Sequence, residues 1–258
     1  MKRVQFLTGI ILSTLFVTAT FAKALTPNLK SRLHYQLGGG KLKNYSTANY
    51  VGVDLFEGTR ATVDKLHKEG RYVICYFSAG TAENYRSDYK SFPKAALGKK
   101  MPEWPDEQWL DIRHSGVMAV HKKRLDKAVA LDCDGVDPDN VDGYSNNTGF
   151  KITQEDEKKF LKTLAAEARA RGLDIGLKNA TDIAASLATT MDWIIVEECF
   201  KYKECDKYAA FPKAGKAAFL IEYTKYSQKQ CDAAKKLNMN LMFSENDYAL
   251  KGPFKYCN

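Results

Sequence analysis

Residues 134–144 read Asp-Gly-Val-Asp-Pro-Asp-Asn-Val-Asp-Gly-Tyr, a stretch that holds four aspartates. Val136 and Val141, flanked by glycines, predict a short buried strand that runs out into a turn. Asp, Asn, Gly and Pro also cluster in ordinary surface turns. A calcium loop is excluded, because Val141 stands where an EF-hand needs a ligand oxygen. A functional role is favoured because other predicted strands also end in a charged or polar residue.

Strand and helix candidates alternate along the rest of the chain, which predicts a parallel sheet. Residues 25–50 are expected to form an irregular lead-in. Besides 134–144, the predicted strands are 50–56, 71–77, 109–113, 173–179, 192–198, 216–223 and 240–244. The predicted helices are 60–69, 117–131, a helix capped by Thr153 and closed by Gly172, 181–190 and 227–237.

Eight such strands fit a single-domain α/β fold, a (β/α)8 TIM barrel over residues 25–258. A doubly wound open sheet is the alternative, but it usually carries a phosphate-binding glycine loop, and Gly38–Gly40 is poorly placed for one. In a barrel the active site lies at the carboxyl ends of the strands. That edge would bring together Asp54, Ser78, Arg113, Asp139, Lys178, Glu197 and Glu222.

The amino terminus has the pattern of a secretory signal peptide over residues 1–24. Lys2 and Arg3 precede an apolar run, and Ala22-Lys23-Ala24 forms a small-x-small cleavage site. We therefore expect a secreted or periplasmic protein that leaves the membrane after cleavage. The formal charge of +8 is spread over the chain and shows no basic stripe with interleaved aromatics, so nucleic acid is not an expected partner.

Six cysteines in an exported chain suggest disulfides. Cys199–Cys205 would close a short loop, and Cys231–Cys257 would fix the carboxyl terminus. Cys75 and Cys133 lie in predicted core strands, and their pairing stays open, with free thiols as one possibility. A zinc site is disfavoured because no CxxC pair with a nearby histidine is present.

The chain lacks a GxSxG elbow, a P-loop and an HExxH motif, which leaves carboxylates as the candidate catalytic groups. Glycosidases use two carboxyl groups that flank the scissile bond. Asp139 and Glu197 end two different predicted strands and form the best pair. Strand alternation places Trp193, Ile195 and Glu197 on one face, whereas Glu198 is expected to face solvent.

Several motifs together resemble glycoside hydrolase family 114, typified by endo-α-1,4-polygalactosaminidases. They are Val73 to Gly80, Trp109 to Arg113, Asp134 to Tyr144, Leu177-Lys178-Asn179, Glu197-Glu198-Cys199 and Cys205. The resemblance implies a (β/α)8 barrel that hydrolyses galactosamine-containing polysaccharide without a metal or other cofactor. It also implies that Asp139 and Glu197 are catalytic, and it supports the Cys199–Cys205 disulfide.

Under this hypothesis Asp139 is the nucleophile or base and Glu197 the acid, with the reverse assignment open. Two positions depart from the family pattern, which commonly has Asn at Val196 and Glu at Asp137. Loss of an amide beside the acid would favour a rival, a non-catalytic glycan-binding barrel. We expect a monomer. The expected substrate-binding residues are Asp54, Tyr76, Ser78, Asp111, Arg113, Asn140, Asp142, Tyr144, Lys178, Asn179, Glu222 and Tyr223.

Overall fold

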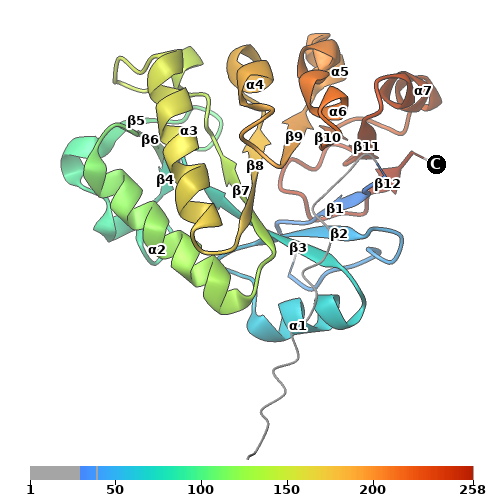
Figure 1. Cartoon of the computed structure of the whole chain (residues 1–258), viewed down its shortest axis with the longest axis horizontal. Helices are drawn as coiled ribbons and strands as arrows, with labels where there is room; N and C mark the ends of the chain where they lie inside the picture. The colour runs from blue at the N-terminus through green and yellow to red at the C-terminus, as the bar shows by residue number, and fades with distance from the viewer. Residues whose placement is uncertain (1–29, 39, 258) are drawn as a thin grey trace, which may run out of the picture.

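The computed structural model describes residues 30–38 and 40–257, so the expected signal peptide lies outside the described residues. Eight parallel strands follow one another around a barrel (Figure 1). The first and last of them, β1 and β11, lie in contact, so the sheet closes on itself. The strands are β1 (Leu33–Tyr35), β2 (Tyr50–Asp54), β3 (Tyr72–Ser78), β7 (Gly135–Asp139), β8 (Asp174–Lys178), β9 (Trp193–Glu197), β10 (Ala217–Glu222) and β11 (Asn240–Phe243).

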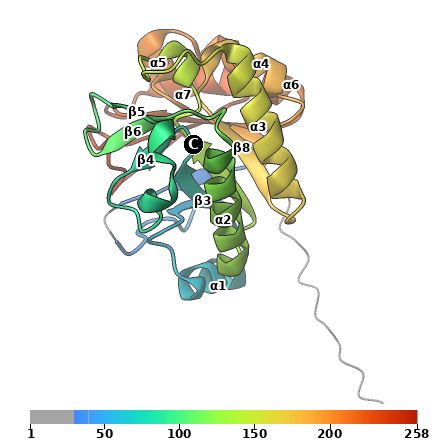
Figure 2. The same ribbon diagram turned by 90° about the vertical axis from the view of Figure 1, so that its left-hand side faces the viewer.

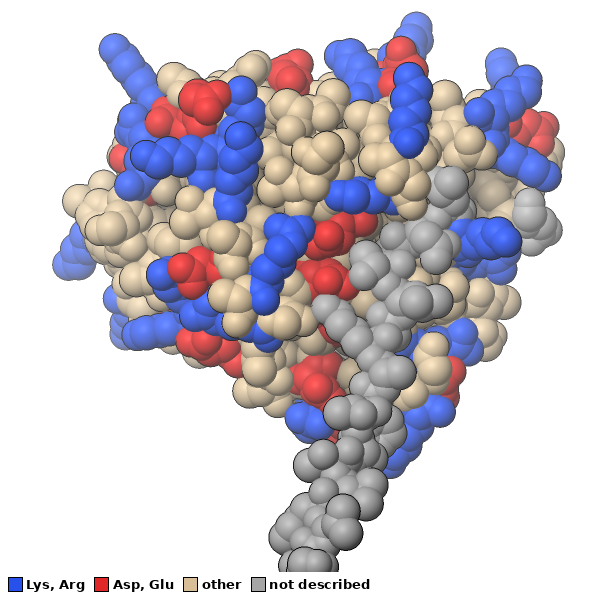
Figure 3. Space-filling view, viewed as in Figure 1, with Lys and Arg blue, Asp and Glu red and all other residues tan. Residues whose placement is uncertain are grey.

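Helices cover the outside of this sheet (Figure 1). They are α1 (Arg60–Lys68), α2 (Ser115–Leu131), α3 (Gln154–Arg169), α4 (Thr181–Leu187), α5 (Cys199–Tyr202), α6 (Ala210–Lys213) and α7 (Gln228–Lys236). Short 3-10 turns span Tyr89–Ser91, Lys94–Ala96, Gly143–Ser145 and Cys205–Tyr208. No helix in the described ranges is long and apolar enough to cross a membrane. Lys and Arg are scattered over the helical face with Asp and Glu among them (Figure 3).

A second, small sheet interrupts the barrel pattern between β3 and α2. Its order is β4-β6-β5, with β4 (Thr81–Glu83), β5 (Leu97–Lys100) and β6 (Glu107–Leu110) all antiparallel. Figure 2 shows it beside the barrel, on the other side of the view from α3. A two-residue strand, β12 (Lys255–Tyr256), pairs antiparallel with β11 at the carboxyl end of the chain.

The barrel prediction is confirmed, but one predicted strand is not a barrel strand, and one barrel strand is not among those predicted. The segment 109–113 is not a barrel strand, because Trp109 and Leu110 belong to β6 of the small sheet. The strand β1 lies within the expected irregular lead-in. Barrel strands such as β3 are buried along their whole length, whereas alternation of the kind in Trp-Leu-Asp-Ile-Arg is typical of antiparallel strands. A strand of only three residues gives too short a pattern to detect.

Large aromatic side chains fill the barrel interior. Tyr35, Tyr72 and Trp193 belong to the inner cluster, while Ile194 and Val196 of β9 face the helices. Glycines make room for the indole, because a Cβ at Gly176 or Gly135 would collide with Trp193. The alternation predicted for β9 therefore holds, and it directs Glu197 to the inner side of the sheet.

Helix α3 begins as expected, because Thr153 and Asp156 form a reciprocal capping box. The structure contains three disulfides, Cys199–Cys205, Cys231–Cys257 and Cys75–Cys133. The third disulfide shows that Cys75 and Cys133 are paired and are not free thiols. It links the middle of β3 to the turn before β7, because β3 and β7 are neighbours in the sheet.

Candidate active site

A cleft of about 800 Å³ opens at the carboxyl ends of the barrel strands. Its lining contains both expected catalytic carboxylates and most of the expected substrate-binding residues, which the sequence separates widely. The expected residues that line the cleft are Asp54, Tyr76, Asp139, Asn140, Asp142, Lys178, Asn179, Glu197 and Tyr223.

At the centre of the cleft, one lysine forms ion pairs with two carboxylates. The ammonium nitrogen of Lys178 lies 3.2 Å from Oδ1 of Asp139 and 3.1 Å from Oε2 of Glu197. Those two oxygens can be separated by no more than the sum of these distances. Burial lowers the pKa of Lys178, but attraction to the surrounding carboxylates outweighs burial and raises the pKa above its usual value. The lysine is therefore a fixed cation between two carboxylates.

Further donors hold each carboxylate in place. Asp139 accepts hydrogen bonds from the Tyr76 hydroxyl at 3.1 Å and from the backbone N–H of Asn140 at 2.7 Å. Glu197 accepts one from the Tyr223 hydroxyl. Burial raises the pKa of both tyrosines, with the nearby carboxylates acting in the same direction. Both hydroxyls therefore stay protonated and can donate.

The residue after each of three site strands adopts a left-handed backbone. Asn140, Asn179 and Glu198 have φ values of 59°, 48° and 57°. Asn tolerates this region better than most residues, whereas Glu does so at a cost of roughly 1–3 kcal/mol. After this turn, the side-chain oxygen of Asn179 accepts a hydrogen bond from the backbone N–H of Glu197 at 2.8 Å. The turn after β3 also fits closely, because a Cβ at Gly80 would overlap the Asn140 carbonyl oxygen.

Asp137 lies on the same face of β7 as Asp139, one layer below the ion pair. It is fully buried and accepts a hydrogen bond from the Tyr35 hydroxyl. Burial raises its pKa to about 7, against the opposing effect of Lys178. The Tyr35 ring also lies under Lys178, with the ammonium 5.8 Å from its centroid. Tyr35 and Asp137 thus form a buried support for the lysine.

Five expected substrate-binding residues do not line the cleft. Ser78 is buried behind Asn140. The side chains of Asp111 and Arg113 form an ion pair with each other. The Glu222 carboxylate accepts a hydrogen bond from the Phe200 backbone N–H at 2.8 Å. Tyr144 packs against the helix-facing core. Val196 also points into that core, so a side chain at this position is not beside Glu197, contrary to expectation. Val196 therefore does not support the rival hypothesis of a non-catalytic glycan-binding barrel.

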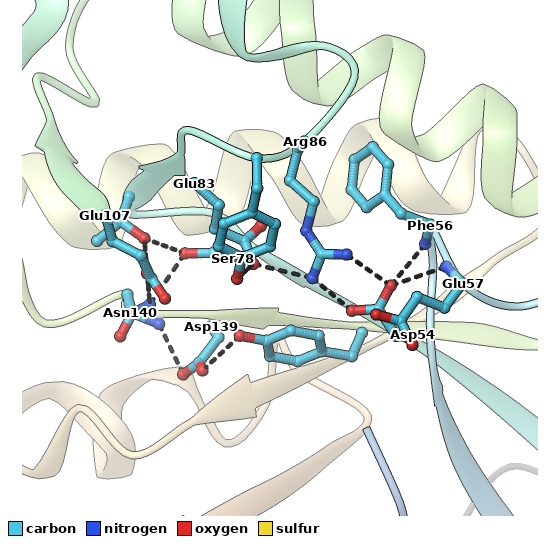
Figure 4. A network of polar contacts seen from close by, with 12 residues as sticks. Asp54, Phe56, Glu57, Ser78, Glu83, Arg86, Glu107, Asp139 and Asn140 are labelled. Carbon is cyan, nitrogen blue, oxygen red and sulfur yellow. Dashed lines mark hydrogen bonds and ion pairs between the residues drawn. The ribbon is translucent and has the colours of Figure 1, made fainter. Parts of the chain in front are cut away.

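Several residues that line the cleft are not among the predicted site residues. Glu198 lines the cleft instead of facing open solvent. Arg86 joins Asp54 of β2 to Glu83 of β4, as Figure 4 shows. Exposed aromatic side chains also lie at the cleft, and the richness of one loop in aromatic residues could have indicated some of them. The additional residues that matter are Glu83, Tyr85, Arg86, Trp104, Glu107, Tyr202 and Tyr248.

Curated relatives match part of this chain. An uncharacterised protein of Deinococcus radiodurans is 27% identical over 175 residues, covering 60% of this chain and 57% of the relative. Protein MJ1477 of Methanocaldococcus jannaschii, also uncharacterised, is 27% identical over 159 residues, covering 55% and 46%. This chain thus spans about half the length of the curated relatives it matches.

Solved structures match nearly all of it. Aspergillus fumigatus Ega3, solved in complex with galactosamine, is 38% identical with a TM-score of 0.85, covering 92% of this chain and 98% of that chain. The glycoside hydrolase domain of PelA from Pseudomonas aeruginosa has a TM-score of 0.65 at 14% identity, covering 87% and 98%, and is a likeness of fold. The model of glycoside-hydrolase family GH114 matches residues 16–258. This chain belongs to glycoside-hydrolase family GH114.

Proposed function

We propose that this protein hydrolyses α-1,4-linked, galactosamine-containing polysaccharide, with Asp139 and Glu197 as the catalytic carboxylates. The observation that carries the proposal is the pair of carboxylates held on one ammonium group in an open cleft. The galactosamine bound to Ega3, a relative of 38% identity, supports the substrate class.

The charge of the cleft supports a cationic polymer as the substrate. Its lining has more carboxylates than the two cations Arg86 and Lys178, although the whole chain carries a formal charge of +8. Unlike charges attract across such a cleft and raise the local concentration of substrate. The cleft carboxylates are Asp54, Glu57, Glu83, Glu103, Glu107, Asp139, Asp142, Glu197 and Glu198.

The spacing of the two carboxylates favours retention of configuration. The Asp139 and Glu197 oxygens that contact Lys178 lie no farther apart than the sum of their distances from it, whereas inverting enzymes hold their carboxyl groups about 6.5–9.5 Å apart to admit a water. Asp139 accepts more hydrogen bonds than Glu197, which suits an anionic nucleophile. Asp139 attacks the anomeric carbon, Glu197 protonates the leaving oxygen, and water then cleaves the glycosyl–Asp139 bond with Glu197 as base.

Exposed aromatics at the cleft fit a polymer rather than a small molecule. Tyr85 and Trp104 come from the segment that carries the small sheet. Tyr202 ends α5, which follows β9, and Tyr248 comes from the loop after β11. Aromatic rings offer flat apolar faces with polar edges, which sugar rings can cover. We further propose a secreted or periplasmic monomer, since three disulfides suit an oxidising compartment.

The test is to incubate the purified protein with α-1,4-linked galactosamine polymer and to follow new reducing ends. Wild type should release them, and Asp139→Asn and Glu197→Gln should lower the rate by at least about 10³-fold. Asp64→Asn, on the exposed face of α1, is the matched control and should keep the rate. Polymer retained in a pull-down without new reducing ends would instead establish the glycan-binding barrel.

A further inference from the structure

Two glutamates of the small sheet face each other at the cleft. Glu83 of β4 and Glu107 of β6 lie directly opposite in the antiparallel register. Both line the cleft, and they are only 1% and 7% exposed. Like charges directly opposite each other destabilise a sheet, and burial of a charge adds a desolvation cost. The fold therefore tolerates an unfavourable pair next to its catalytic residues.

The protein's own donors leave one oxygen of this pair unsatisfied. Oε1 of Glu83 accepts from Arg86 at 2.9 Å and from Tyr85 at 2.8 Å, but the buried Oε2 has no hydrogen-bond partner among the described residues. Arg86 is also shared with Asp54 (Figure 4). A buried acceptor without a donor destabilises the folded protein, because its lost hydration is not replaced. A bound donor would remove that destabilisation.

Glu107 connects the pair to the catalytic centre. Its Oε2 accepts from Thr81 and, at 3.4 Å, from the amide of Asn140, the residue after Asp139. Burial raises the pKa of Glu107 to about 7, and the charges of Glu83 and Asp139 add to that rise although the Thr81 hydrogen bond opposes it. A cation bound beside Glu107 would favour its ionised form.

We propose that Glu83 and Glu107 bind the protonated amine of a 2-amino sugar and set a preference for de-N-acetylated over N-acetylated sugar units. This inference rests on the proposed function. It assigns substrate selection to the small inserted sheet, whereas the barrel strands carry the cleavage.

The chemistry of the two substituents explains the selection. An ammonium group is compact and has three donors, so it can bond the free Oε2 of Glu83 and a Glu107 oxygen at once. These bonds are charge-assisted and roughly twice as strong as neutral ones. An acetamido group offers one N–H and brings a carbonyl and a methyl group, which would leave a buried carboxylate unpaired. Sites with buried polar groups reject such analogues strongly.

A metal cation is the competing occupant. Ca²⁺ takes 6–8 oxygen ligands, more than two glutamates supply. Within residues 30–38 and 40–257 no cluster of three or more His, Cys, Asp or Glu could hold a metal ion. The ammonium is therefore the better match for two opposed carboxylates.

The test compares kcat/KM on α-1,4-linked galactosamine oligomers with kcat/KM on N-acetylated oligomers of the same length. In Glu83→Gln/Glu107→Gln the preference for the amine should fall by about 10²-fold, as for a lost charged contact of about 3 kcal/mol. Asp106→Asn removes one exposed charge just before β6 and should keep the preference. Glu107→Gln should unfold no earlier than wild type, because it relieves like-charge repulsion. An equal loss on both substrates, or a lower unfolding temperature, would show a structural role and overturn the proposal.

A binding measurement separates this inference from the proposed hydrolysis. Galactosamine oligomers should bind Glu197→Gln and should bind at least about 10-fold more weakly when both Gln changes are added. Such weakening, together with a wild-type protein that cleaves nothing, would keep the amine site and reject the hydrolysis. Cleavage with an unchanged amine preference would reject the amine site alone, and absence of oligomer binding would reject both. Stabilisation by CaCl₂ that disappears in the double variant would assign the pair to a metal and overturn the proposal.

Discussion

The ammonium nitrogen of Lys178 lies 3.1 Å from a carboxylate oxygen of Glu197, inside a barrel end where the lysine side chain is 2% exposed. Lys178 ends β8 and Glu197 ends β9, and these strands are neighbours in the sheet. A buried cation between two carboxylates lets both lie close together with little mutual repulsion. The contact therefore fixes the positions of the two carboxylates relative to each other.

Lys178→Met should lower kcat/KM by at least about 10²-fold, comparable to the loss of one electrostatic catalytic contact. Without the ammonium the two carboxylates lose the common contact that holds them in place. Initial rates on the galactosamine polymer measure the loss. Lys158→Met, which removes an α3 lysine paired with Glu155, is the control. A kcat/KM equal to that of wild type would contradict this role for Lys178.

Gly80→Ala should disrupt the site through the backbone. The added Cβ would overlap the Asn140 carbonyl oxygen, and backbone cannot move aside as a flexible side chain can. We expect a loss of about 1–3 kcal/mol in the free energy of unfolding, or more, together with lower activity. Gly143→Ala is the matched change, because its Cβ would meet nothing closer than 3.4 Å. Equal unfolding curves for the two variants would argue against the close fit.

The three disulfides should differ in their contribution to stability. Cys75–Cys133 spans 58 residues and Cys199–Cys205 spans 6. Because the entropy removed from the unfolded chain grows with loop length, their losses should be about 4 and about 2 kcal/mol. Denaturant unfolding of the paired Cys→Ala variants measures both values. A larger loss for the short loop would mean that native packing, and not loop closure, dominates.

Glu157 should make stability depend on pH. It is buried in α3, and burial, with Asp142 as the next cause, raises its pKa from 4.5 to about 8. The folded state therefore holds the proton between these values while the unfolded state releases it. Stability falls as pH rises through this window.

Glu157→Gln should flatten that slope and raise the unfolding temperature most at about pH 8, where the buried carboxyl begins to ionise. Thermal unfolding from pH 5 to 8 measures the effect. Glu155→Gln is the control, because Glu155 lies in the same helix with an exposed side chain. An identical slope in wild type and Glu157→Gln would show that this group does not titrate as described.

Much of the barrel could be predicted because its signals are local. The alternation in β9 that directs Glu197 inward is a property of five consecutive residues, and the cap at Thr153 is set by Asp156 three residues later. The strand β1 was missed because three residues give no usable period. The small sheet was missed because its pairing joins Glu83 to Glu107 across a long connection.

The sequence by itself determined the alternation of strands and helices, most of the groups at the strand ends and the side of β9 on which Glu197 projects, because side-chain period and capping act over a few residues. Only the tertiary structure decided that Lys178 bridges Asp139 and Glu197, that Trp109 and Leu110 belong to the small sheet, and that Glu83 and Glu107 oppose each other. Those contacts depend on barrel closure and strand register, which are set by packing between residues far apart in the chain.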